Sequence, residues 1–152
     1  DEKKDLGPLV NAKINFELII NDYPKSDFAL DAELKLEAIK EILASKEMYT
    51  ARYYFEKEKW IPAINRYKNI LENYETTIFA EEALHRLVEI HYKLGLESEA
   101  KKYAVLLGYN YQSSEWYEES YKIFNKNYKK KSLRDKKSLK KSTLEKLKSL
   151  IQ

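Results

Sequence analysis

Glycine and proline are scarce in this chain, and their scarcity restricts the folds that it can adopt. Three glycines and three prolines occur among 152 residues, against usual frequencies of about 7% and 5%. Because these residues make most tight turns, their shortage indicates few turns and long helices joined by short loops. A fold of many short strands would need more of them. The sequence therefore predicts an all-α protein.

Apolar residues recur at helical spacing through most of the chain. The helices expected from this pattern cover residues 9–22, 62–74, 79–94 and 97–107, with a further short helix that Ser114 is expected to cap. The segment 29–58 holds neither glycine nor proline, and it is predicted as one helix of about 30 residues or as two with a break near Ala44-Ser45-Lys46. The expected apolar stripes are Val10, Ile14 and Leu18, widened by Phe16, Ile19 and Ile20, and then Leu30, Leu34, Ala38 and Ile42, followed by Met48, Ala51, Tyr54 and Phe55.

Short polar or flexible residues mark the expected helix ends. Ser26 or Asp27 can cap the helix that follows Pro24, because a side-chain oxygen there accepts from the first free backbone N–H groups. Gly95 suits the left-handed position after a helix, and Gly108 is expected to end the helix that begins near Glu97.

The expected helices can be grouped into consecutive pairs, and the second helix of each pair shows the same sequence pattern. The pattern is a small residue, an aromatic or small residue four positions later, and an apolar residue seven positions after the first. The three copies read Ala12, Phe16 and Ile19; Ala63, Tyr67 and Ile70; Ala100, Ala104 and Leu107. The last two copies are 37 residues apart, close to the 34-residue tetratricopeptide period. The pattern predicts an α-solenoid of tetratricopeptide-type helix pairs over 1–125. Because the chain opens on a second helix without its first, we expect an N-terminally truncated array with more repeats upstream.

No combination of residues in the sequence indicates catalysis, a metal or a cofactor. There is no cysteine, so disulfides and thiolate zinc sites are excluded. His85 and His91 are six residues apart and face different sides of a helix, whereas zinc ligands on a helix favour a spacing of four. Adjacent acids such as Glu81 and Glu82 diverge around their helix, and we expect them on a solvated face. We predict a non-enzymatic protein without a cofactor.

The charge is divided unevenly between the repeats and the end of the chain. Residues 126–152 carry eleven Lys or Arg and two acidic residues, a net charge of +9, whereas residues 1–125 have a net charge of −6. This basic tail is predicted either as a solvated, partly disordered extension or as an amphipathic helix at a membrane surface, with Leu144, Leu147 and Ile151 on one face. Nucleic-acid contact is the weakest alternative, because the tail lacks interleaved aromatic residues and the repeats are acidic.

Tyrosine, tryptophan and arginine dominate protein interfaces, and several lie near expected turns and repeat edges. Most of the thirteen tyrosines recur at helical spacing and are expected to pack between helices. From the tyrosine, tryptophan and arginine residues near turns and repeat edges, we expect Trp60, Arg66, Trp116 and Tyr117 to contact a partner.

Several sequence motifs resemble the BamD family, the tetratricopeptide-repeat lipoproteins of the outer-membrane β-barrel assembly machinery. The motifs are Lys46-Glu47-Met48-Tyr49 with Arg52-Tyr53-Tyr54, Ala63-Ile64-Asn65-Arg66-Tyr67, Glu82-Ala83-Leu84-His85-Arg86-Leu87-Val88-Glu89, Leu94-Gly95-Leu96 with Glu99-Ala100, and Ser113-Ser114-Glu115-Trp116-Tyr117. The resemblance covers about residues 10–125. It does not extend to the basic tail, and the family's Tyr-Pro is replaced at 74–75 and 111–112.

The resemblance implies a non-catalytic scaffold at the periplasmic face of the outer membrane, anchored by an N-terminal lipid that this chain lacks. It implies docking onto the membrane-proximal POTRA domain of BamA, association with other assembly lipoproteins, and contact with unfolded outer membrane proteins, but not with nucleic acid. By position, Arg52, Asn65 and Arg66 join the expected binding residues, with Arg66 pairing to a BamA carboxylate. The basic tail could add a weak membrane contact. The alternative is a generic tetratricopeptide adaptor that binds a peptide or protein.

Overall fold

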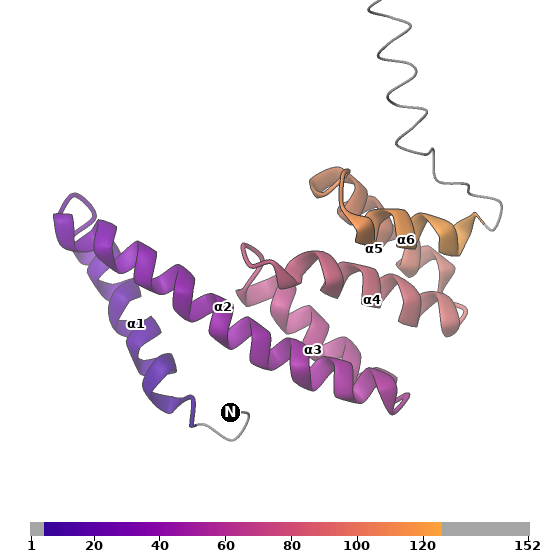
Figure 1. Ribbon diagram of the computed structural model, residues 1–152, viewed down its shortest axis with the longest axis horizontal. Coiled ribbons are helices and arrows are strands. Elements are labelled where there is room, and N and C mark those ends of the chain that lie inside the picture. Colours follow the sequence, from indigo (N-terminus) through magenta and orange to yellow (C-terminus); the bar gives the residue numbers. More distant parts are fainter. Residues whose placement is uncertain (1–4, 126–152) are drawn as a thin grey trace, which may run out of the picture.

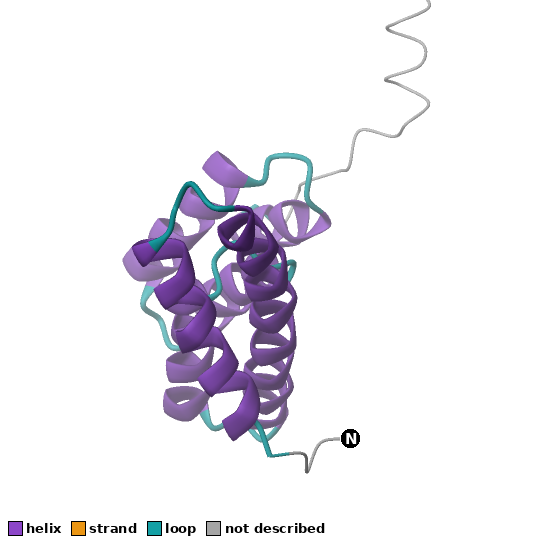
Figure 2. Cartoon of the chain, turned by 90° about the vertical axis from the view of Figure 1, so that its left-hand side faces the viewer, coloured by secondary structure: helices purple, strands orange, loops and turns teal. Residues whose placement is uncertain are grey.

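The computed structural model describes residues 5–125, and the predicted basic tail at 126–152 lies outside the described residues. Between residues 5 and 125 the chain is helical, without a strand (Figures 1 and 2). The helices are α1 (Gly7–Asp22), α2 (Asp27–Glu56), α3 (Trp60–Asn73), α4 (Phe79–Lys93), α5 (Glu97–Asn110) and α6 (Glu115–Phe124). The all-α prediction is confirmed.

Each helix packs on the next one along the chain, from α1 on α2 to α4 on α5, while α6 lies against both α4 and α5 (Figure 1). Loops of a few residues reverse the chain between them, which gives the α-solenoid arrangement that the repeat pattern predicted. No helix among the described residues is long and apolar enough to cross a membrane.

The long segment in the middle of the sequence forms one helix, which settles the question that the sequence left open. Helix α2 continues through Ala44, Ser45 and Lys46 without a break. Ala44 is fully buried, and the Ser45 hydroxyl donates to the Ile42 carbonyl oxygen at 2.8 Å, so the polar side chain is satisfied within the helix.

The predicted apolar stripes of the first two helices coincide with the buried face only in the second half of α2. Val10, Ile14 and Leu18 are about half exposed, and Leu30 and Leu34 are more exposed still. The predicted Met48 and Ala51 are buried in the second half of α2, but over residues 27–43 the buried residues are Ala29, Ala32, Leu36, Ile39 and Leu43. These residues alternate steps of three and four and stay on one side of the helix, whereas a row of fourth residues drifts around it.

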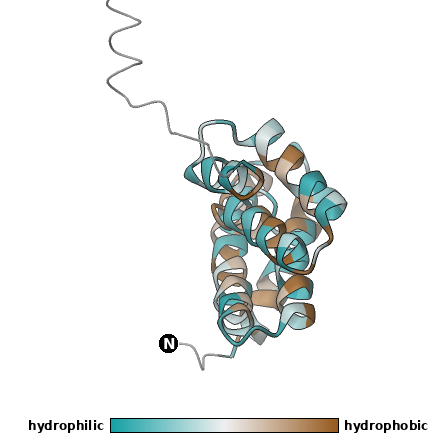
Figure 3. Ribbon diagram, turned by 90° about the vertical axis from the view of Figure 1, so that its right-hand side faces the viewer, coloured by the Kyte–Doolittle hydropathy of each residue, from teal (hydrophilic) through white to brown (hydrophobic). Residues whose placement is uncertain are grey.

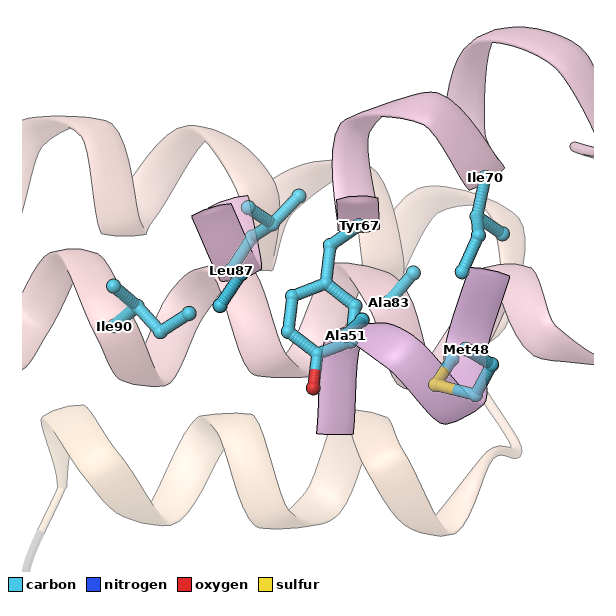
Figure 4. Packing of buried hydrophobic residues seen from close by; sticks show 8 residues of the cluster. Met48, Ala51, Tyr67, Ile70, Ala83, Leu87 and Ile90 are labelled. Atoms are coloured by element: carbon cyan, nitrogen blue, oxygen red, sulfur yellow. The ribbon is translucent and has the colours of Figure 1, made fainter. Parts of the chain in front are cut away.

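The core lies where α2, α3 and α4 meet. Figure 4 shows the ring of Tyr67 between Leu87 and the small side chains of Ala51 and Ala83. All four residues are fully buried. Small residues thus let neighbouring helices approach, and the aromatic ring fills the space between pairs, as the repeat pattern indicated.

The predicted caps are confirmed at three helix ends. Ser26 and Ser114 accept, through their hydroxyl oxygens, from the backbone N–H groups of Ala29 and Trp116, each at 3.1 Å. Gly95 follows α4 with a φ of 77°, a conformation that costs glycine least.

The prediction that Gly108 ends its helix is wrong, because α5 continues through it to Asn110. A Cβ atom at Gly108 would lie 2.7 Å from Cε2 of Tyr117 on α6. The absence of a side chain at Gly108 therefore lets the ring of Tyr117 on α6 approach the backbone of α5.

Candidate partner-binding site

The residues predicted to bind a partner are distributed over several parts of the structure. Asn65 and Arg66 share a hollow on α3, whereas Arg52 and Trp116 belong to a polar network between α2, α4 and α6. Trp60 is partly buried and packs against the core, and Tyr117 lines a groove between α5 and α6.

A shallow polar hollow of about 260 Å³ lies over the start of α3. Its lining consists of Tyr54, Pro62, Asn65, Arg66 and Asn69. The buried face of α3, formed by Ala63, Tyr67 and Ile70, points toward the core. Helical spacing therefore turns Asn65, Arg66 and Asn69 outward together.

Arg66 is held in this hollow by a glutamate from the neighbouring helix. Its Nη1 group donates to Oε1 and Oε2 of Glu47, each at 3.1 Å, and 46% of the arginine side chain is exposed. A guanidinium carries five N–H donors in a fixed plane. Within the described residues Glu47 engages only Nη1, so the donors on Nε and Nη2 can reach a second acceptor.

The chemistry of the hollow suits a carboxylate side chain from another protein. Arg66 offers positive charge and directional donors, and the Asn65 amide adds a further donor. Asn69 is oriented by its own bond, since its side-chain oxygen accepts from Nδ2 of Asn73 at 2.7 Å. The hollow therefore combines a positioned cation with neutral polar groups at the surface.

The second group of residues surrounds Glu82 on α4, which the sequence placed on a solvated face. That expectation is wrong: the side chain of Glu82 is only 7% exposed. Arg52 donates through Nε at 2.9 Å and pairs again through Nη2, and this bond with Glu82 is the main reason that the pKa of Arg52 is raised. Nε of Arg86 lies 3.6 Å from Oε1 of the same carboxylate. The carboxylate of Glu82 therefore forms ion pairs with two arginines.

Arg86 links this carboxylate to the last helix. Its guanidinium lies 4.9 Å from the ring centre of Phe55 and 5.5 Å from that of Trp116, and its Nη1 group donates to Glu89 at 2.6 Å. A cation between two aromatic faces gains from both ring quadrupoles. The face of Trp116 on this side is therefore used within the chain.

His85 joins the same network on the α6 side. Its Nδ1 lies 2.8 Å from the hydroxyl oxygen of the buried Ser120, and its ring centre lies 5.1 Å from that of Trp116. Burial lowers the pKa of His85, with the nearby Glu89 acting in the opposite direction. Among the described residues, no three His, Cys, Asp or Glu side chains are grouped as a metal site would need.

Two aromatic residues from the predicted set are partly buried. The rings of Trp60 and Phe55 meet edge to face, with their centres 5.7 Å apart, and Nζ of Lys93 lies 5.4 Å from the centre of the Trp60 ring. Tyr117 packs on Gly108 and Tyr121. Both side chains stabilise helix contacts while keeping an exposed edge.

Arg52 also borders a larger apolar hollow of about 760 Å³ between the start of α1 and the middle of α2. The other residues that line it are Asp5, Leu6, Pro8, Leu9, Ile42, Ser45, Lys46, Tyr49 and Phe79. Sequence reasoning missed this hollow, as well as Glu47 and Ser120. The pairing of Glu47 with Arg66 spans 19 residues, and only the antiparallel packing of α2 and α3 brings the two side chains together.

The stacked helix pairs define an α-solenoid protein of tetratricopeptide-like repeats. Comparison with known proteins gives the particular family. Residues 1–106 match the YfiO family, described as outer membrane lipoprotein. The chain belongs to this family of outer membrane lipoproteins, as the sequence motifs predicted.

Individual relatives agree with this assignment. The chain is 44% identical over 128 residues to the outer membrane protein assembly factor BamD of Rickettsia prowazekii, covering 84% of this chain and 51% of that protein. It is 35% identical over 127 residues to the protein of the same name from Caulobacter vibrioides, covering 84% of this chain and 42% of that protein. The chain thus spans about half the length of these relatives.

Proposed function

We propose that this chain is the docking part of a non-catalytic scaffold in outer membrane protein assembly. The names of its relatives describe assembly factors, and its family is one of outer membrane lipoproteins. On this proposal the intact protein is held by a lipid at the periplasmic face of the outer membrane. It works there with the other lipoproteins of the machinery on unfolded outer membrane proteins.

The polar hollow on α3 is the proposed contact with BamA, in which Arg66 pairs with a carboxylate of a POTRA domain. The observation that supports this most is the half-exposed guanidinium of Arg66, which Glu47 orients through Nη1 alone. An arginine already positioned loses less side-chain entropy when it binds than a free one would. A carboxylate that reaches Nε and Nη2 would form the paired bonds that arginine makes best.

Charge reversal at Arg66 tests this proposal. We expect Arg66→Glu to weaken binding to the periplasmic domains of BamA at least tenfold, because a partner carboxylate would face a like charge. Lys68→Glu is the matched control: Lys68 is exposed on the same helix, two residues away and outside the hollow, and the charge change is identical. Affinity would be measured by calorimetry after circular dichroism has shown that both variants fold.

The outcomes separate the site from the function. If Arg66→Glu and Lys68→Glu both bind as tightly as the unmodified chain, the hollow is not the contact. If the unmodified chain itself does not bind the BamA domains, the proposed partner is wrong.

A further inference from the structure

Helices α5 and α6 form an apolar groove that the proposed contact with BamA does not use. It has a volume of about 610 Å³, and its lining consists of Lys101, Ala104, Val105, Gly108, Tyr109, Gln112, Tyr117, Ser120, Tyr121 and Phe124. At its edge Val105 is 72% exposed and Tyr109 is 82% exposed. Figure 3, which looks at this end of the molecule, shows hydrophobic residues interspersed with hydrophilic ones along the helices.

The pairing of helices explains why this groove is open within the described residues. Helices α2 and α3 form one pair and α4 and α5 the next, so α6 is the first helix of a third pair. Only Ala100 and Leu107 of α5 and Ser120 of α6 are buried, whereas α4 between its neighbours has nine buried residues. In stacked repeats the second helix of each pair covers the outer face of the pair before it. The groove is where such a segment would lie.

The chain itself continues from this position. Phe124, the last residue of α6, lines the groove, and residues 126–152 follow after Asn125. Leu144, Leu147 and Ile151 recur at spacings of three and four, which places them on one face if this stretch is helical. About 19 residues separate Asn125 from Leu144, and even at 1.5 Å per residue they span roughly 28 Å, enough to reach any part of the groove.

Charge favours the same occupant. Residues 126–152 have a net charge of +9, and residues 1–125 have a net charge of −6. Helices α5 and α6 together carry five glutamates and three lysines; of these eight residues Lys101 lines the groove, and the glutamates lie outside its lining. A basic segment with one apolar face can therefore place leucine side chains in the groove and lysine side chains toward these glutamates, an arrangement that salt would weaken.

We propose that the groove between α5 and α6 is the docking site for the apolar side chains of residues 126–152 of the same chain. Leu144, Leu147 and Ile151 fill the space between Val105, Tyr109 and Tyr121. The segment then supplies the missing half of the third helix pair, and it shields tyrosine and valine side chains from water.

Cysteine cross-linking within residues 1–152 tests this proposal, since this stretch contains no cysteine. The variant Tyr109→Cys with Leu147→Cys is compared with the control Ile61→Cys with Leu147→Cys, because Ile61 is 75% exposed on α3 and lies outside the groove. Disulfide formation within one chain would be followed at low micromolar concentration. We expect the groove pair to form it at least tenfold faster than the control pair, and 1 M salt to reduce the difference.

A third variant, which adds Leu144→Glu and Ile151→Glu to the groove pair, should bring its rate down to that of the control. Equal rates in the groove and control pairs would overturn the proposal. So would disulfides that form only between two chains, which would assign the groove to a second copy.

Discussion

Arg66 and Arg52 each pair with a glutamate from a neighbouring helix, but the surroundings of the two pairs differ. Arg66 meets Glu47 at the edge of an open hollow, and one nitrogen makes both bonds. Arg52 meets Glu82, which is almost completely buried and also faces Arg86. The same side-chain chemistry therefore leaves donors available for a partner in one region and holds helices together in the other.

The comparison shows why residue type alone does not identify a binding site. An exposed ion pair contributes little to folding, because water solvates both charges nearly as well when they are apart. A buried carboxylate has lost that solvation, so removing one member of its network leaves the other uncompensated. We therefore expect substitutions in the Glu82 region to change stability, and substitutions in the Arg66 region to change binding.

The largest effect is expected at Glu82. Glu82→Gln removes the charge that faces Arg52 and Arg86, and it should lower the free energy of unfolding by about 2 kcal/mol, less than for a fully buried pair because half of Arg52 is exposed. Glu47→Gln is the matched control and should cost less than about 1 kcal/mol. Urea denaturation followed by circular dichroism measures both. An equal decrease in the free energy of unfolding in Glu82→Gln and Glu47→Gln would show that the two ion pairs do not differ in their contribution to stability.

A smaller effect is expected from pH through His85. Because burial lowers the pKa of His85 below its ordinary value of 6.5, the unfolded chain takes up a proton there before the folded chain does. Stability should therefore fall as the pH drops below about 6.5. In His85→Asn, which can keep a bond to Ser120, this part of the fall should be absent, as shown by unfolding curves between pH 7.5 and 5. Identical pH profiles would show that His85 does not carry the effect.

The fold was predictable because scarcity of turn residues and helical periodicity are local properties of the sequence. The caps at Ser26, Ser114 and Gly95 depend on a few neighbouring atoms, and they were correct. The buried face in the first half of α2 was not, because a row of fourth residues such as Leu30 and Leu34 drifts around the helix. The helix instead buries Ala32, Leu36 and Ile39, which alternate steps of three and four.

The candidate sites were harder to predict, because the contacts that define them join distant parts of the chain. The bond between His85 and Ser120 spans 35 residues, and the pair between Arg52 and Glu82 spans 30. Spacing on one helix cannot show that Glu82 turns inward to meet a cation from another. Arg66 was expected at an interface from its residue type and from its family motif, but its pairing with Glu47 required the structure.

The most direct test of this account measures the affinity of Arg66→Gln and Arg52→Gln for the periplasmic domains of BamA side by side. Both variants lose one positive charge from an arginine that pairs with glutamate. We predict that Arg66→Gln binds at least tenfold more weakly while unfolding at the same temperature as the unmodified chain. Arg52→Gln should bind normally and unfold at a lower temperature. Equal loss of affinity in the two variants, or loss only in Arg52→Gln, would contradict the assignment of Arg66 to the partner and Arg52 to the fold.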